Sequence, residues 1–401
     1  MSTQLFVVCI LSLLIISSIA ANAVPVIDAA ARARLDKLTD DVTAQHITPG
    51  GCIVIGTKDG PLFAKAYGHM TYDADSPAVT LDTLYDMASC SKVVGTTSTL
   101  ALLLQDGKLH LDDPVSKYLP AWNRDDKRNI TIWNLATHTS GLPAYTSAWA
   151  AESIRKPDEP HSDALIEHIA SLPLKYETGK GFTYSCLNFL TLARVNETAA
   201  GTAQERFLRA RLFEPLGMVN SGYYLRAEEK ERCAPTIGGM GFRQGVVHDP
   251  LAYYYRDGYH CPGNAGLFST ANDLTRFCRM LLSDGKWGDK QIFTPDTIDM
   301  FSTQQIPKGV DASRGIGWGI SDEHPYATSL NRDTKSACFS HSGYTGTYIL
   351  IDRLSGAFMI SLTNRVYPDD TASGAIITRS VRHIMLECDP IYKDVLEAPE
   401  S

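Results

Sequence analysis

Residues 87–94 read Met-Ala-Ser-Cys-Ser-Lys-Val-Val, which places a serine and a lysine three positions apart. They open a segment that predicts a helix from about Ser91 to Gln105, with Gly107 just past its end. Ser89 and Lys92 would then project from one face of the first turn, because residues three apart are neighbours on a helix. A serine hydroxyl needs a nearby base to act as a nucleophile. Lys92 can be that base only if burial and the positive helix N-terminus disfavour its ammonium form.

The same turn could also stabilise negative charge, since the helix N-terminus places the Ser89 N–H where an oxyanion would form. A serine followed by a lysine is, however, also common at a capped and solvated helix start, so the spacing alone leaves both interpretations open. Other hydrolase motifs do not occur in the sequence, which has no G-x-S-x-G elbow, no H-E-x-x-H and no Walker loop.

The composition is that of a globular protein. Of the 401 residues, 44% are hydrophobic and 20% are charged, which excludes a disordered, collagen-like or coiled-coil chain. The 37 Lys+Arg against 45 Asp+Glu give a formal net charge of −8. Nucleic-acid binding is not expected, because it requires a basic footprint. The length exceeds what one hydrophobic core usually spans, so we expect two subdomains or one large two-layer fold.

The N-terminus has the pattern of an export signal. Residues 5–21 are apolar or small and uncharged, and Ala21-Asn22-Ala23 follows as an A-x-A cleavage site. Residues 1–23 are therefore predicted to be a signal peptide, and the mature protein to be secreted or periplasmic. No Lys or Arg precedes the apolar run, so an uncleaved N-terminal membrane anchor is the alternative. Charges interrupt every later apolar run, and no further membrane span is expected.

Cysteine usage fits an exported protein. Nine cysteines are present, and loss of Cys9 with the signal would leave an even number, as disulfides in an oxidising compartment require. Buried free thiols are the equal alternative. The spacings are irregular and include no C-x-x-C, so a zinc site is not expected.

Strand patterns lie near both ends of the chain, and helical patterns fill the middle. The predicted strands are residues 52–55, 63–67, 348–351 and 357–363, and the predicted helices, besides 91–105, are 28–42, 163–171, 189–198, 274–282 and 375–387. The expected class is α/β (α+β), with one antiparallel sheet flanked by terminal helices and a mainly helical insertion. Residues 24–115 and 301–401 are expected to form the sheet domain, and 116–300 the helical domain, within a single unit.

Ordered blocks over most of the mature chain resemble a known family. They are residues 88–92 (ASCSK), 106–109 (DGKL), 111–120 (LDDPVSKYLP), 130–132 (ITI), 138–142 (HTSGL), 178–179 (TG), 182–185 (FTYS), 263–269 (GNAGLFS), 341–346 (HSGYTG) and 362–365 (LTNR). The pattern is similar to that of the penicillin-recognising serine hydrolases, which include class C β-lactamases, serine DD-carboxypeptidases and family VIII carboxylesterases. The resemblance implies the β-lactamase/DD-peptidase-like fold.

The resemblance also implies roles for single residues. Ser89 matches the acylated nucleophile, and Lys92 the lysine of the first motif. Tyr184 matches the tyrosine of the second, Y-x-N motif, which shares proton transfer with the lysine. His341-Ser342-Gly343 matches the third motif, K-T-G in β-lactamases and H-T-G in some DD-peptidases, and should lie on the strand that lines the cleft. The Tyr344 N–H would be the second oxyanion donor, beside that of Ser89.

Substrate-binding residues are expected in the third motif and at Cys186. His341 would contact a substrate carboxylate, tune Lys92 or orient other groups, and Gly343 would let the substrate approach the backbone. His138 is expected to build a loop, and residues 253–255, a run of three tyrosines, to pack as a loop instead of lining the cleft.

The second motif departs from the family pattern, because it reads Tyr184-Ser185-Cys186. The asparagine that Cys186 replaces donates to the substrate's amide carbonyl, and a thiol is a poor replacement. Asn188, two residues further on, should point elsewhere. The departure favours esters or an unusual amide over β-lactams. Cys90 and Cys186 should both lie near the cleft, and a disulfide between them is a further hypothesis.

Together these features predict an exported, metal-independent serine hydrolase that works through an acyl-enzyme without a cofactor. The expected partner is a small-molecule or peptide substrate: a D-amino-acid peptide, a small ester or a β-lactam. No nucleic acid is expected to bind, and no stable membrane span should remain after signal cleavage. The alternatives are a non-catalytic binding or sensor module on the same fold, and an acyltransferase.

Overall fold

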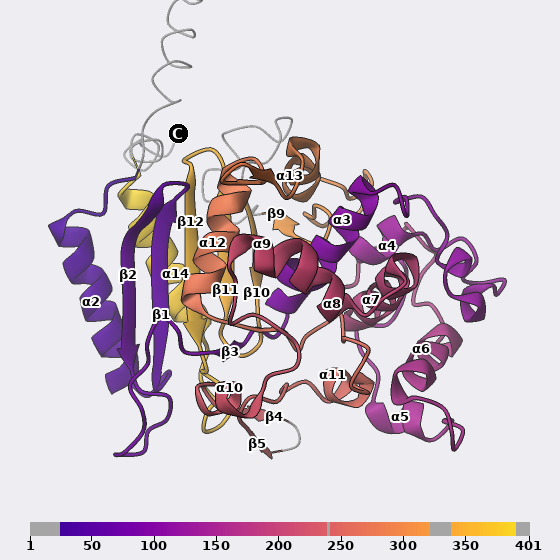
Figure 1. The fold of residues 1–401 in the computed structure, drawn as a ribbon, viewed down its shortest axis with the longest axis horizontal. Helices are drawn as coiled ribbons and strands as arrows, with labels where there is room; N and C mark the ends of the chain where they lie inside the picture. The colour runs from indigo at the N-terminus through magenta and orange to yellow at the C-terminus, as the bar shows by residue number, and fades with distance from the viewer. Residues whose placement is uncertain (1–24, 239–240, 321–337, 390–401) are drawn as a thin grey trace, which may run out of the picture.

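The computed structural model describes residues 25–238, 241–320 and 338–389 (Figure 1). The predicted signal peptide, residues 1–23, lies outside the described residues. So does the last part of the predicted sheet domain, beyond residue 389. The division of the chain at residues 115 and 301 stays a prediction.

A six-stranded antiparallel sheet joins the two ends of the chain, as predicted. Its strand order is β2-β1-β12-β11-β10-β9. The N-terminal strand β1 pairs with the C-terminal strand β12, with Gly51 opposite Thr363 and Thr57 opposite Ala357. The strands are β1 (Gly50–Thr57), β2 (Gly60–Gly68), β9 (Gly319–Ile320), β10 (Cys338–Ser342), β11 (Tyr348–Asp352) and β12 (Ala357–Thr363).

Helices cover both faces of this sheet (Figure 1). The terminal helices α2 (Ala29–Ala44) and α14 (Ala375–Glu387) pack together on one face, and α12 (Ala271–Leu282) packs on the other. Alternate residues of β1 enter different cores: Ile53 and Ile55 face α2 and α14, and their neighbours face α12. Burial on both faces explains why β1 reads as a continuous apolar run instead of an alternating one.

Most predicted elements occur where the sequence placed them. The hairpin of β1 and β2 is present, and α14 has the predicted bounds. Asp28 caps α2, because its Oδ1 accepts a hydrogen bond from the Ala31 N–H at 2.8 Å. The predicted middle helices are α6 (His161–Ser171), α7 (Cys186–Ala200) and α12.

The helix after Ser89 differs from the prediction in its first half. It opens as a π-helix, η2 (Lys92–Thr97), and continues as α3 (Ser98–Gln105). Gly95 lies in this turn, and any larger residue there would clash, because a Cβ would lie 2.0 Å from the Tyr223 hydroxyl. π-Helical turns of this kind are frequent at functional sites.

The remaining elements are short. The helices are η3 (Val115–Lys117), η4 (Pro120–Trp122), α4 (Ile132–Ala136), α5 (Ala148–Glu152), α8 (Gln204–Leu208), η5 (Arg209–Phe213), α9 (Glu214–Leu216), α10 (Ala227–Glu231), α11 (Pro250–Tyr255) and α13 (Pro295–Ser302). The strands are β3 (Tyr85–Asp86), β4 (Thr236–Gly238), β5 (Gly241–Arg243), β6 (Phe268–Ser269), β7 (Lys286–Trp287) and β8 (Lys290–Gln291). Residues 253–255, predicted as a loop, therefore belong to α11.

Candidate active site

Ser89 lies on a tight turn between β3 and η2. The preceding residue, Ala88, has φ +45°, a left-handed conformation that is strained for a residue with a Cβ. Asp86 holds it there, because its Oδ1 accepts the Ala88 N–H at 2.9 Å. The residue before Ala88 is also fixed, by a 2.9 Å hydrogen bond from the Met87 N–H to the Leu267 carbonyl. Ser89 is thus presented half-exposed on a rigid support.

Lys92 joins Ser89 to the rest of the site. Its side chain is fully buried, and Nζ donates to Ser89 Oγ at 3.0 Å, to the Asn264 carbonyl at 2.8 Å and to Cys186 Sγ at 3.6 Å. The three acceptors match the three protons of an ammonium group.

The charge state of Lys92 differs from the one the sequence argument required. Burial disfavours the ammonium, but the neighbouring Cys186 and Tyr184 outweigh burial, so the pKa of Lys92 is raised above its ordinary value. Lys92 therefore holds Ser89 Oγ as a proton donor. The condition that its ammonium be disfavoured is not met in this environment.

Tyr184 lies directly before α7, and the start of that helix fixes it. Ser185 caps α7 by accepting the Leu187 N–H at 3.2 Å, and its own N–H donates to His138 Nδ1 at 3.0 Å. The Tyr184 ring then lies 5.0 Å from Lys92 Nζ and 4.6 Å from the His138 ring, centroid to centroid. The structure therefore brings Ser89, Lys92 and Tyr184 together.

His138, predicted to build a loop, also packs against Tyr184. It is buried with φ +61°, and burial together with nearby Arg314 and Lys92 holds its pKa well below the ordinary histidine value. The ring is neutral, in agreement with its Nδ1 accepting the Ser185 N–H.

The third motif ends β10 beside the Ser89 turn. His341 is buried, and its Nδ1 donates to the Ser342 carbonyl at 2.9 Å. Burial, followed by the charges of Arg314 and Lys92, lowers the pKa of His341 to about 3, so this histidine is neutral as well. Ser342 is exposed.

Close packing explains why position 343 is a glycine, which was not foreseen from the sequence. A Cβ at this position would lie 2.0 Å from Thr347 Oγ1 and 2.6 Å from the Met87 carbonyl. Only glycine therefore lets the end of β10 approach the Ser89 turn this closely. This requirement is independent of any contact between Gly343 and the substrate.

Tyr344 follows with its side chain anchored and its N–H free. The ring stacks on His248 at 5.6 Å between centroids, the Arg365 guanidinium lies 5.0 Å from it, and the hydroxyl donates to Asp370. Among the described residues, neither the Tyr344 N–H nor the Ser89 N–H has an acceptor. Both donors remain available for an oxyanion.

An Asp86–His248 pair below the turn was missed by sequence reasoning. Asp86 Oδ2 accepts the His248 backbone N–H at 2.7 Å and its Nδ1–H at 2.8 Å. Burial lowers the pKa of His248, but the Asp86 carboxylate outweighs burial and raises it above the ordinary value. Asp86 holds the turn that carries the Ser89 N–H, and His248 stacks on the Tyr344 ring. The pair therefore connects the residues that position both free N–H groups. No motif links two residues so far apart in the chain.

The proposed Cys90–Cys186 disulfide is wrong. Cys90 and Cys186 are both free thiols. Cys90 Sγ instead donates to the His341 carbonyl at 3.4 Å, and burial raises its pKa to about 12. Asn188 points away from the cleft as predicted, since it accepts a 2.6 Å hydrogen bond from Ser140 Oγ.

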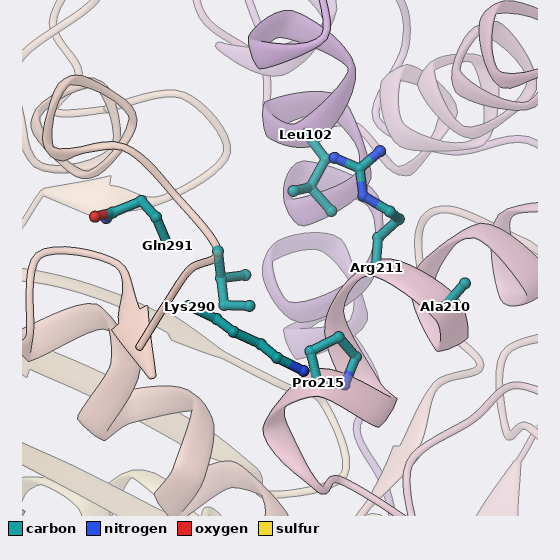
Figure 2. Close-up of a pocket in the computed structure, with 7 residues that line it drawn as sticks. Leu102, Ala210, Arg211, Pro215, Lys290 and Gln291 are labelled. Carbon is teal, nitrogen blue, oxygen red and sulfur yellow. The ribbon is translucent and has the colours of Figure 1, made fainter. Parts of the chain in front are cut away.

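A separate hollow of about 350 Å³ lies elsewhere on the molecule (Figure 2). Leu102, in its wall, follows Ser89 by 13 residues, which corresponds to roughly 20 Å along the helix. Arg211 in the wall is already paired with Asp106 at 2.7 Å. Nothing in this lining connects to Ser89. In the described part of the chain, no group of three or more His, Cys, Asp or Glu side chains is placed to hold a metal ion.

A family model described as beta-lactamase matches residues 35–382. The chain belongs to the beta-lactamase family. A "Putative D-alanyl-D-alanine carboxypeptidase" of Escherichia coli (strain K12) is 28% identical over 327 residues, which cover 75% of this chain and 74% of that protein. An "N-acetylmuramyl-L-alanine amidase" of Bacillus subtilis (strain 168) is 27% identical over 357 residues, with 81% and 80% covered.

Solved structures agree with this beta-lactamase family fold. A hydrolase with promiscuous acyltransferase activity, EstCE1, superposes with a TM-score of 0.70 at 19% identity, over 88% of this chain and 98% of that one. Membership of a family with serine hydrolase members supports a hydrolase. At these identities the comparisons leave the substrate open.

Proposed function

We propose that this protein is an exported serine hydrolase that forms an acyl-enzyme on Ser89. The observation that carries the proposal is the 3.0 Å contact between Lys92 Nζ and Ser89 Oγ, made by a buried lysine that is also held by the Asn264 carbonyl. A solvated helix start would leave the lysine in water, so this burial argues against that alternative.

In the proposed reaction Ser89 Oγ attacks a substrate carbonyl, while Lys92 and Tyr184 move the protons. The N–H groups of Ser89 and Tyr344 bind the oxygen on which negative charge develops. Water then attacks the acyl-enzyme and releases the acid. The neutral His341 would line the cleft with Ser342 and Gly343, and would offer the substrate hydrogen bonds without a charge.

The proposed substrate is an ester or a D-amino-acid amide. The relatives named as a carboxypeptidase and an amidase point to cell-wall peptides. Cys186 favours esters, because its thiol already contacts Lys92 and lacks the amide donor of an asparagine. Slow β-lactam turnover is the third substrate class.

Covalent labelling tests this proposal. The mature protein is incubated with a fluorophosphonate and, separately, with a fluorescent penicillin, and the intact mass is read. We expect an adduct that Ser89→Ala abolishes and that Ser153→Ala, a change of an exposed serine just after α5, retains. Labelling by both probes would favour D-amino-acid peptides or β-lactams, and labelling by the phosphonate alone would favour an esterase. Folded protein that takes up neither probe would contradict the hydrolase and leave a binding module.

Two further parts of the proposal have their own tests. An acyltransferase would give a new ester or amide when an alcohol or amine is added during turnover of an ester substrate, whereas a hydrolase gives only the acid. Export is tested by N-terminal sequencing of the secreted protein, which should begin at residue 24. None of the helices in the described part of the chain has the length and apolar character of a membrane span.

A further inference from the structure

A second hollow, of about 550 Å³, lies where α5, α6 and α11 meet (Figure 1). Small-molecule sites commonly have volumes of about 300–1,000 Å³, so this hollow is large enough for an organic ligand. Its lining includes Ala148 of α5, His161 of α6 and Pro250 of α11. Since the three helices also pack against one another, the fold fixes the shape of the hollow.

Tyrosine rings form much of the wall of this hollow. Tyr253 and Tyr254 line it from α11, and Tyr224 lines it from the segment before α10. The Tyr253 side chain is 42% exposed, and the Tyr254 ring meets the His161 ring edge-on with 4.8 Å between centroids. Aromatic rings that remain accessible around a concave surface favour a flat apolar group, which can stack on them or meet their edges.

Two guanidinium groups lie on these tyrosine rings. Arg256 lines the hollow, and its Cζ is 4.6 Å from the Tyr224 ring centroid. The Cζ of Arg243 is 4.5 Å from the Tyr253 ring centroid, and its buried Nε has no hydrogen-bond partner among the described residues. Neither arginine forms an ion pair with a carboxylate in the described part of the chain. A guanidinium that stacks on a ring still presents N–H donors at its edge, where they match the two oxygens of a carboxylate.

The acidic side chains next to the hollow already have partners. Asp257, which follows Arg256, accepts a 2.7 Å hydrogen bond from Ser162 Oγ and two more from backbone N–H groups of its own loop. Glu152, at the end of α5, pairs with Arg155 at 2.8 Å. Neither carboxylate lines the hollow. The positive charge that Arg256 brings to the lining is therefore not balanced by either of them.

We propose that this hollow binds an organic anion with a flat apolar ring, such as an aromatic carboxylate, which Arg256 holds by its charge while the tyrosines contact the ring. The inference goes beyond the proposed function, because none of the groups assigned to acyl transfer lines the hollow. A path of contacts still joins the two places. Pro250 in the wall follows Asp249, whose Oδ1 accepts from Asn264 Nδ2 at 3.1 Å, and the Asn264 carbonyl accepts from Lys92 Nζ at 2.8 Å. The anion is therefore either a distal part of the substrate or a separate small molecule.

Calorimetric titration with β-naphthoate and with its uncharged analogue β-naphthamide tests the proposal. We expect one naphthoate to bind per chain and the amide to bind about tenfold or more weakly, because the amide lacks the charge-assisted hydrogen bonds with Arg256. Arg256→Gln should lower the naphthoate affinity to that of the amide and leave the amide affinity unchanged. Ala148→Trp should fill the hollow and remove binding of both compounds. The matched control is Arg211→Gln, since Arg211 lines the hollow of about 350 Å³ and also lies on a ring, 5.5 Å from the Phe207 centroid; it should bind naphthoate as the wild type does.

Three results would overturn the proposal. They are the absence of saturable naphthoate binding, equal affinity of the wild type for both compounds, and naphthoate binding that Arg256→Gln and Ala148→Trp both leave unchanged. These measurements need no turnover, so a protein without a Ser89-dependent adduct would contradict the proposed function and leave this site standing.

Ester hydrolysis then identifies the source of the anion. Two esters are compared that differ only in carrying a distal naphthoate or a distal naphthamide group. If the hollow holds part of the substrate, kcat/KM should be about tenfold or more higher for the charged ester, and Arg256→Gln should remove the difference. Equal kcat/KM values in a protein that binds naphthoate would assign the hollow to a separate small molecule.

Discussion

Removal of the Asp86 carboxylate should destabilise the fold and the Ser89 turn together. In Asp86→Ala three buried donors lose their acceptor: the N–H of Ala88, and the N–H and Nδ1–H of His248. Each buried donor without a partner costs about 1–3 kcal/mol. Relaxation of the strained φ at Ala88 returns about 1 kcal/mol. We expect the free energy of unfolding to fall by about 3–5 kcal/mol, the range for breaking a buried charge pair.

Urea unfolding of Asp86→Ala, Asp86→Asn and wild type measures this loss. Asparagine keeps one acceptor oxygen, so Asp86→Asn should lose about half as much and stay folded for labelling with a fluorophosphonate. Its Ser89 labelling should slow by about tenfold or more, because a loosened turn costs about 1.4 kcal/mol of orientation. The control is Asp36→Ala, which removes a surface pair with Lys65 and should cost less than about 1 kcal/mol. A loss in Asp86→Ala no larger than in this control would refute the reasoning.

Three other changes test separate parts of the site. His248 has a raised pKa in the folded state, so its stabilising effect is full below the unfolded value of about 6.5 and is lost as pH rises through the folded value. The difference in unfolding free energy between wild type and His248→Gln should therefore be larger at about pH 6 than at about pH 9, and a constant difference would contradict an ion pair. Gly343→Ala should lower the free energy of unfolding by about 1–3 kcal/mol and remove most of the activity, because its Cβ would lie 2.0 Å from Thr347 Oγ1. Its control is Ser342→Ala, a change of the exposed neighbour, which should alter the free energy of unfolding by less than about 0.5 kcal/mol. Cys186→Asn should raise penicillin acylation relative to ester hydrolysis, as judged against Cys186→Ser, and an unchanged ratio would show that this position does not set the substrate class.

The sheet and its covering helices could be predicted because their signals are local. Strand β12 and helix α14 carry apolar periods that are complete within single segments, and both were placed correctly from the sequence. The π-helical start after Ser89 could not be predicted in this way. Within that turn Gly95 lies against Tyr223, a residue far away in the chain that it meets only in the folded core.

Of the candidate site, too, only the part marked by local sequence patterns could be predicted. Ser89, Lys92 and Tyr184 could be proposed because each lies in a short block of residues. His248 could not, since its importance comes from the Tyr344 ring and the Asp86 carboxylate, which distant segments contribute, and no local pattern marks it. The charge on Lys92 was also beyond the sequence, because it is decided by neighbours from other elements.

The pairing of β1 with β12 makes the molecule a natural candidate for splitting into two inactive fragments. A cut in the helical region between them leaves β1, β2 and the Ser89 turn on one fragment, and β10, β11 and β12 on the other. Neither fragment has a complete sheet, and the first lacks His341 and Tyr344. Activity should therefore return only when the fragments reassociate through the pairing of β1 with β12, which would turn this hydrolase fold into a reporter of whatever brings its two halves together.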